Sequence, residues 1–145
     1  MSVELQVRVE HEDGFRCRGF VREHGPYAAD VRPPLGGDAG PGGLEWLLLS
    51  LAMCSGQTTA GILKKMRVPF EGLEVRASGT KRDEHPTVLT AIRLEFVVRG
   101  KGLDAAAVEK AVRMSEEKYC PVWAMLKGGT PVSSTVRVAE GGAAG

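Results

Sequence analysis

The sequence predicts an α+β fold with mostly antiparallel strands. Residues 3–9, 73–79 and 88–99 alternate apolar and polar side chains, which is the period of a half-buried strand. A long helical segment covers residues 44–67, and apolar spacing at the helical period returns over residues 105–117. The order is therefore strands, a long helix, strands, helices and a final strand, which is the pattern of an α+β protein.

Composition and charge indicate a single soluble domain. The chain has 145 residues, of which 43% are hydrophobic and 26% charged, and its net charge is +1. A charge so close to zero predicts no nucleic-acid or membrane partner. The first residues lack the apolar segment of a signal peptide, and the apolar run Leu44–Met53 is too short to span a bilayer. We therefore expect one cytoplasmic domain over residues 1–145, with residues 140–145 as a disordered tail.

A hairpin and a third strand open the chain. Glu12-Asp13-Gly14 supplies the turn between the first strand and a returning strand over residues 15–21. Residues 27–31 can form a third short strand, which Pro33-Pro34 stops. Residues 36–43 hold five glycines and a proline, and this composition predicts a loop before the long helix.

The long helix is unusually apolar in its first half, which predicts burial on every side. The residues responsible are Leu44, Trp46, Leu47, Leu48, Leu49, Leu51, Ala52 and Met53. The second half is amphipathic and ends in Lys64, Lys65 and Arg67, cations that suit a helix C-terminus. At ~1.5 Å per residue the helix would be roughly 35 Å long, which is more than a domain of this size needs. We therefore expect a second subunit to bury it.

The remaining elements follow from caps and breaks. The two later strands are joined by the polar turn TKRDEHP, and Asp104 is a good N-cap for the helix over residues 105–117. Pro121 ends that helix, and residues 122–126 make one or two further helical turns. Residues 131–138 read as the last strand.

Three cysteines carry the candidate chemistry. Their odd number and wide spacing exclude a secreted disulfide framework, and no Cys-x-x-Cys pair indicates zinc. Because the three histidines are also scattered, we expect no metal and no bound cofactor. Cys17 lies on a predicted strand and is interpreted as a packing residue.

The two later cysteines each have a functional and a structural interpretation. Cys120 precedes Pro121, which makes it a candidate N-cap whose thiolate the helix amides would stabilise. The alternative is a buried structural thiol at a helix break. Cys54 lies in the apolar helix and can be a small buried hydrophobe. The small polar residues 55–59 that follow it instead indicate a cavity or a closely packed backbone at that point.

Glu45 is an acid within a run of large apolar residues. It is either a first-turn residue favoured by the helix dipole or a buried carboxylate that needs a cation. The nearest candidate cations in the sequence are Arg16, Arg18, Arg22 and Arg32. Such an arginine would also be suited to keep the Cys54 thiol charged.

Two motifs together resemble the OsmC/Ohr superfamily. Residues 40–45, Gly-Pro-Gly-Gly-Leu-Glu, and the segment from Leu47 to Cys54 are similar to its first motif. Residues 118–122, Lys-Tyr-Cys-Pro-Val, are similar to its second motif. The order of elements agrees over nearly the whole chain.

The resemblance implies an intertwined homodimer, in which mostly antiparallel sheets wrap around long central helices and two active sites lie at the interface. It implies that Cys54 attacks an organic hydroperoxide and becomes a sulfenic acid, while Cys120 resolves it to a disulfide. An external dithiol such as dihydrolipoamide then restores both thiols. The catalytic set is thus Cys54, Cys120 and Glu45, and the apolar helix favours bulky organic hydroperoxides over hydrogen peroxide.

The chain departs from the family pattern at two places. Gly43 stands where the family motif has a proline before the acid. Glu45, the acid itself, lies nine residues before Cys54, as in the broader OsmC-like branch. Ohr proteins have an arginine beside an Asp-Gly turn in the first hairpin. The matching turn here, Glu12-Asp13-Gly14, has no arginine before Arg16 and Arg18, so one of these two is expected to stabilise the Cys54 thiolate. The alternatives are a non-peroxidatic protein that binds a hydrophobic small molecule or handles sulfur in the dimer pocket, and a structural dimer with inert cysteines.

Overall fold

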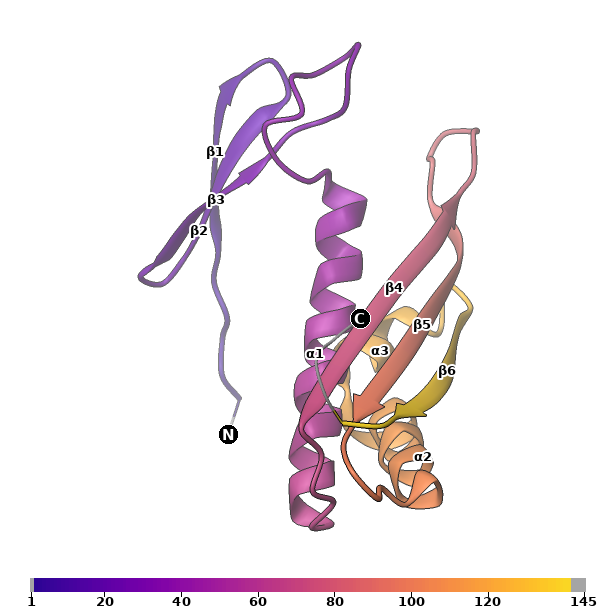
Figure 1. Ribbon diagram of the computed structural model, residues 1–145. Helices are drawn as coiled ribbons and strands as arrows, with labels where there is room; N and C mark the ends of the chain where they lie inside the picture. Colours follow the sequence, from indigo (N-terminus) through magenta and orange to yellow (C-terminus); the bar gives the residue numbers. More distant parts are fainter. Residues whose placement is uncertain (1, 142–145) are drawn as a thin grey trace. The chain divides into compact units, whose positions relative to one another are not determined.

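The computed structural model describes residues 2–141 (Figure 1). In chain order the elements are β1 (Arg8–Asp13), β2 (Arg16–Val21), β3 (His24–Ala29), α1 (Gly43–Lys65), β4 (Gly72–Lys81), β5 (Leu89–Arg99), α2 (Ala105–Met114), the π-helix η1 (Ser115–Tyr119), α3 (Pro121–Leu126) and β6 (Val132–Ala139). This order confirms the α+β class. Residues 142–145 of the predicted tail lie outside the described residues.

Contacts gather in two compact units, Met1–Leu47 and Leu48–Gly145. The first unit holds the antiparallel sheet β1-β2-β3, and the second holds the sheet β4-β5-β6. In the second sheet β4 pairs antiparallel to β5, whereas β5 and β6 are parallel. Most pairings are therefore antiparallel, as predicted, while the single-domain assignment stays a prediction.

The first hairpin begins later than its alternation suggests. The turn at Gly14 forms as predicted, with a φ of 56° that glycine adopts without strain. Arg8 pairs with Phe20, and only Val21 of β2 remains beyond this pair. The predicted strand over residues 3–9 is therefore wrong over residues 3–7, where Val3, Leu5 and Val7 are 72–89% exposed.

Asp30 organises the loop between β3 and α1. Its carboxylate is buried and accepts hydrogen bonds from the backbone N–H groups of Ala39 (3.0 Å) and Val31 (2.8 Å). These two bonds, that of Ala39 first, lower the pKa of Asp30 below its ordinary value. The loop thus has its own polar centre, and Trp46 closes it by donating from Nε1 to the Ala28 carbonyl (3.2 Å).

Helix α1 confirms the predicted long helix and ends in Lys64 and Lys65, but it is only partly buried in the chain. One stripe of the helix is buried: Leu51, Ser55, Thr59, Ile62 and Leu63. Leu49 and Met53 are 42% and 52% exposed, so the expectation that its first half is buried on every side does not hold within a single chain.

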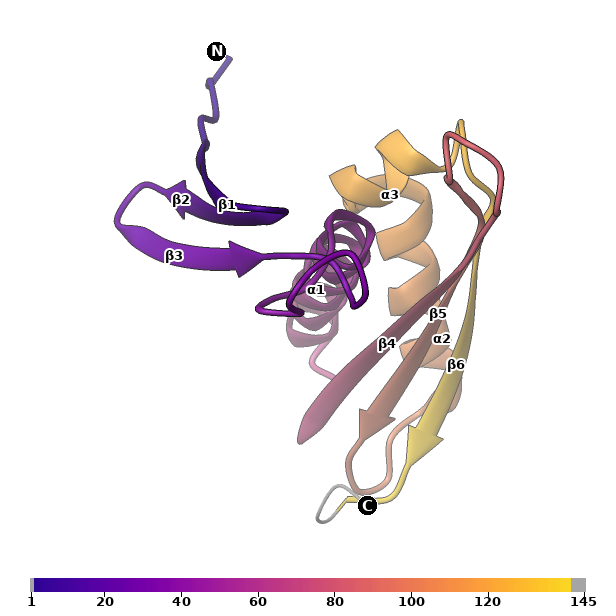
Figure 2. The ribbon, with the colours of Figure 1, turned by 90° about the horizontal axis from the view of Figure 1, so that it is seen from above.

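The second unit encloses the core. All three helices lie on one face of the β4-β5-β6 sheet (Figure 2). Ile62 and Leu63 of α1 pack there with Val98 of β5 and with Val108 and Ala111 of α2. The α1 backbone comes so close to β4 that a Cβ at Gly56 would lie 3.3 Å from Val75.

The connection from α2 to α3 sets the position of Cys120. Asp104 caps α2 as predicted, with its carboxylate accepting from Ala106 N–H at 3.0 Å. The helix does not stay α-helical to residue 117 but widens into η1, where Cys120 N–H reaches back to the Ser115 carbonyl at 2.8 Å. Pro121 then starts α3 in the position where its missing N–H costs nothing.

Candidate active site

Cys120 is the N-cap of α3, as its sequence position predicts. Its backbone is extended, and its Sγ accepts a hydrogen bond from Trp123 N–H at 3.5 Å. The side chain is 1% exposed. The break between η1 and α3 therefore points a thiol into the core of the second unit.

Cys54 lies on α1 and meets Cys120 there. Its thiol is half-buried, and the Cys120 thiol and the Val122 backbone N–H are near enough to act on its pKa. Its carbonyl accepts from the Thr58 hydroxyl at 2.7 Å. The two cysteines, 66 positions apart in the chain, are thus brought together as free thiols, and the first turn of α3 faces both sulfurs.

The environment raises the pKa of the Cys54 thiol above its ordinary value. Burial is the largest cause, and the adjacent Cys120 thiol adds to it. The Val122 N–H and the Thr58 hydroxyl act in the opposite direction without reversing the shift. None of the groups responsible is a cation, so the protein environment described here favours the neutral thiol.

One of the buried hydroxyl groups of the second unit contacts the pair. Ser55 is fully buried, and its Oγ lies 3.4 Å from Cys120 Sγ. Thr59 and Ser115 are also fully buried, and their hydroxyls have no hydrogen-bond partner among residues 2–141. The contact of Ser55 was not foreseen from the sequence. Its signal is the helical spacing, which places Ser55 four residues after Leu51 on the buried stripe.

Glu45 takes the first-turn role rather than that of a buried carboxylate. Its side chain is 54% exposed and accepts from Gly42 N–H at 3.0 Å, which satisfies a free amide at the start of α1. Arg32 is its ionic partner, at 3.5 Å. Of the four candidate cations, the structure thus pairs Arg32 with Glu45.

Arg16 and Arg18 form ion pairs on the first sheet. Arg16 binds Glu12 at 3.1 Å, and Arg18 binds Glu12 at 2.7 Å and Glu10 at 3.4 Å. Both guanidinium groups thus already have carboxylate partners within their own unit. Their action on the Cys54 thiolate stays a prediction.

Comparison with known proteins identifies the family to which the chain belongs. The sequence model of the OsmC-like protein family matches residues 36–135, which include both Cys54 and Cys120. The chain belongs to the OsmC-like family. The resemblance seen in the sequence is thereby confirmed.

Individual relatives support the OsmC-like fold over the full length. Protein YhfA of Escherichia coli strain K12 is 36% identical over 134 residues, covering 92% of this chain and 98% of YhfA. A hypothetical protein from Aquifex aeolicus VF5 has a crystal structure with a TM-score of 0.85 at 30% identity, covering 98% of this chain and 100% of that one. The organic hydroperoxide resistance protein OhrB of Bacillus subtilis gives 0.63 at 19% identity, covering 93% and 98%, which shows the fold alone.

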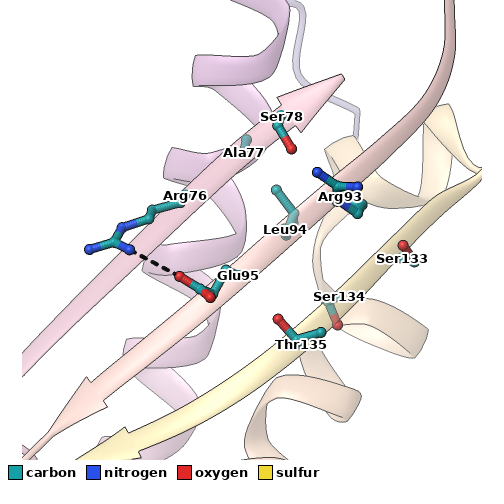
Figure 3. Close-up of a pocket in the computed structure, with 9 residues that line it drawn as sticks. All are labelled: Arg76, Ala77, Ser78, Arg93, Leu94, Glu95, Ser133, Ser134 and Thr135. Carbon is teal, nitrogen blue, oxygen red and sulfur yellow. Dashed lines mark hydrogen bonds and ion pairs between the residues drawn. The ribbon is translucent and has the colours of Figure 1, made fainter. Parts of the chain in front are cut away.

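A shallow hollow on the OsmC-like chain lies apart from the thiols. It has a volume of about 290 Å³ and lies over β4, β5 and β6 (Figure 3). Arg93 and Glu95, which line it, alternate along β5 with buried Leu94 and Phe96, so it opens on the face that the helices leave uncovered. Arg76 there is paired with Glu95 at 3.2 Å. The hollow contains neither Cys54 nor Cys120.

Chemically, the thiol pair can pass between a dithiol and a disulfide. Two neighbouring thiols can be joined as a disulfide after modest movement, provided that the backbone allows the required torsions. Cys17 does not share this chemistry within its own unit, because it pairs with His11 on β1 and Ala29 on β3 in the first sheet. Among residues 2–141 no three His, Cys, Asp or Glu side chains gather as a metal site would need.

Proposed function

We propose that this OsmC-like protein is a thiol-dependent peroxidase that reduces organic hydroperoxides through Cys54 and Cys120. The observation that carries the proposal is that the fold brings the free thiols of Cys54 and Cys120 together beside the first turn of α3. A reactive thiol with a second thiol in contact can close a disulfide before it is oxidised irreversibly. The function of OhrB, an organic hydroperoxide resistance protein of the same fold, supports the substrate class.

The reaction divides into two chemical steps and a regeneration. The Cys54 thiolate attacks the terminal oxygen of ROOH, the O–O bond breaks, and the alcohol leaves with a proton, which yields Cys54–SOH. The Cys120 thiolate then attacks the Cys54 sulfur, and hydroxide leaves and is protonated to water. An external dithiol reduces the disulfide by thiol–disulfide exchange and is itself oxidised.

The difference in exposure supports a division of roles between the two cysteines. Cys54 is half-buried, whereas Cys120 is 1% exposed and bonded to Ser55 and Trp123. A hydroperoxide therefore reaches Cys54 more easily, and Cys120 is held beside it. This difference supports Cys54 as the peroxidatic cysteine and Cys120 as the resolving cysteine.

We propose a homodimer as the working form, with the sites at its interface. Leu49 and Met53 on α1 are 42% and 52% exposed, and Met53 directly precedes Cys54. A second copy that covers these side chains would also enclose the reacting thiol. Helix α1 is long and apolar enough to cross a membrane by length and composition, with 28% of that window buried. Its buried Ser55 and Thr59, however, are packed inside the second unit, which favours a protein partner.

Turnover with a defined reductant tests the peroxidase. We expect the protein to consume cumene hydroperoxide in the presence of dihydrolipoamide, and Cys54→Ser to abolish consumption. Cys17→Ser is the matched control and keeps full activity, since Cys17 has no second cysteine in its own unit with which to form a disulfide. A correctly folded wild-type protein without turnover at any pH between 7 and 9 contradicts the proposal. Arg16→Ala and Arg18→Ala in the same assay test the predicted thiolate-stabilising arginines.

The second candidate is a non-peroxidatic binding protein, and the raised pKa of Cys54 favours it. Burial keeps the thiol neutral, and the neutral form is a poor nucleophile. The exposed apolar side chains of α1 would then serve a hydrophobic small molecule. Lack of peroxide turnover together with saturable binding of a fluorescent fatty-acid probe, lost in Met53→Lys, would support this alternative.

A further inference from the structure

The hydroxyl of Ser55 lies in hydrogen-bond contact with the sulfur of Cys120, at 3.4 Å. We propose that Ser55 is a positioning residue for disulfide formation, orienting the Cys120 sulfur toward Cys54 and donating a hydrogen bond to the Cys120 thiolate as it attacks. This inference rests on the proposed function, because it names the group that prepares the resolving thiol. It assigns Ser55 no contact with the hydroperoxide.

The burial of Ser55 requires an explanation that packing alone does not give. The buried stripe of α1 continues with Ile62 and Leu63, and a hydroxyl on such a stripe costs free energy unless it is hydrogen-bonded. Ser55 has its bond with Cys120, whereas Thr59, one turn further along the same stripe, has no partner among the described residues. The chain therefore contains a buried hydroxyl that contacts the thiol pair and a neighbouring one that does not.

The surroundings of Cys120 determine what the hydroxyl does. The Trp123 N–H can only donate to the sulfur, at 3.5 Å. The Ser55 hydroxyl rotates, so at 3.4 Å it accepts from the thiol S–H and, once the proton has left, donates to the thiolate. The thiolate then has two donors from two different elements, α1 and α3, and these fix the sulfur beside Cys54.

The step that Ser55 assists is the second one of the cycle. The Cys120 thiolate forms the S–S bond with Cys54–SOH, the S–O bond breaks, and the leaving hydroxide takes up a proton to form water. The hydroxyl of Ser55 is unchanged at the end. Because hydrogen bonds to charged groups contribute more than neutral ones, we expect its loss to slow the step about tenfold.

The first experiment separates the two steps by rapid quench. Reduced Ser55→Ala is mixed with one equivalent of cumene hydroperoxide, and dimedone traps Cys54–SOH for intact-mass measurement. We expect the sulfenic acid to form at the wild-type rate and the disulfide to close about tenfold more slowly, with the rate profile moved about one unit to higher pH. Thr59→Val is the control for removal of a buried hydroxyl and leaves both rates unchanged.

The second experiment does not depend on peroxide chemistry. Oxidised glutathione forms a mixed disulfide at Cys54, and attack by Cys120 closes the protein disulfide and releases reduced glutathione. The same tenfold delay in Ser55→Ala, with thermal unfolding equal to that of Thr59→Val, supports the role of Ser55 even if hydroperoxide proves inert. Closure at the wild-type rate with an unchanged pH profile in Ser55→Ala overturns it.

Discussion

The two sheets of this chain differ in the burial of their apolar residues. In the second unit, β5 buries Ile92, Leu94 and Phe96 to 1% exposure or less beneath three helices. In the first unit, Val7 and Val9 alternate in the same way but are 72% and 63% exposed. Every buried hydrophobic residue of the core lies between Leu51 and Trp123 in the described part of the chain. The same strand pattern thus forms a core in one unit only.

This difference shows what the first unit lacks. Its stability comes from strand pairing and from polar contacts, such as the carboxylate of Asp30 in its loop and the ion pairs of Arg16 and Arg18. Isolated three-stranded sheets without a covered face are marginally stable. We propose that a second copy of the chain supplies apolar surface that covers this sheet.

The largest expected effect comes from the closed core. Phe96→Ala should lower the free energy of unfolding by ~3–5 kcal/mol, because it empties a fully buried site. Phe15→Ala, at a residue 53% exposed in the first unit, should cost less than ~0.5 kcal/mol at protein concentrations where the chain is monomeric. Urea unfolding of both variants checks the contrast, and equal losses would show that the first unit has a core of its own.

Subunit association tests whether a second copy covers the apolar residues that the single chain leaves exposed. Leu49→Lys places a cation on the exposed apolar side of α1 and should raise the dimer dissociation constant by about 100-fold, measured by sedimentation velocity. Lys65→Ala, at the exposed end of the same helix, is the control and should not change it. A wild-type protein that sediments as a monomer at all concentrations contradicts the proposed dimer.

The pH dependence tests the same difference, because Cys54 and Cys120 belong to the second unit, whereas Arg16 and Arg18, the candidate stabilising cations, belong to the first. With its pKa raised above the ordinary value of 9.0, Cys54 is about 1% ionised or less at pH 7. The rate of Cys54 oxidation should then rise about tenfold for each pH unit from 7 to 9, measured by stopped flow. A plateau below pH 7 would instead show that a cation stabilises the thiolate in the assembled protein, and loss of that plateau in Arg16→Ala or Arg18→Ala would identify it.

The smallest effect distinguishes the ion pairs of the two units. Glu116, with 12% side-chain exposure, binds Arg113 at 2.8 Å and accepts from the Ser134 hydroxyl. Glu116→Gln should cost ~1–2 kcal/mol, whereas Glu12→Gln on the more exposed first sheet should cost less than ~0.5 kcal/mol. Equal changes in urea midpoint would mean that the two surfaces are equally solvated.

Local signals made most of the fold predictable. The turn at Gly14, the cap at Asp104 and the break at Pro121 each depend on residues adjacent in the sequence, and all three are confirmed. The parallel pairing of β5 with β6 and the widening of η1 were not predictable, because both depend on contacts between distant segments. The alternation of residues 3–9 predicted a strand, but the short partner strand ends the pairing at Arg8.

The candidate site was predictable in its residue types and less so in its contacts. The N-cap position of Cys120 follows from the next residue, and its association with Cys54 was implied by the family resemblance. The role of Ser55 depends on the rotation of α1 against α3, which no local pattern specifies. For Glu45 the sequence left two interpretations, and only the position of Gly42 and Arg32 decides for the helix-start role.

The proposed function requires that a hydroperoxide drives formation of a disulfide between Cys54 and Cys120. The most direct test is to add one equivalent of cumene hydroperoxide to the reduced protein and to measure the intact mass and the peptide map. We expect a loss of about two mass units and a single disulfide between Cys54 and Cys120, with Cys120→Ser stopping at a Cys54 sulfenic acid. An unchanged mass in the folded protein, or a disulfide that involves Cys17, would contradict it.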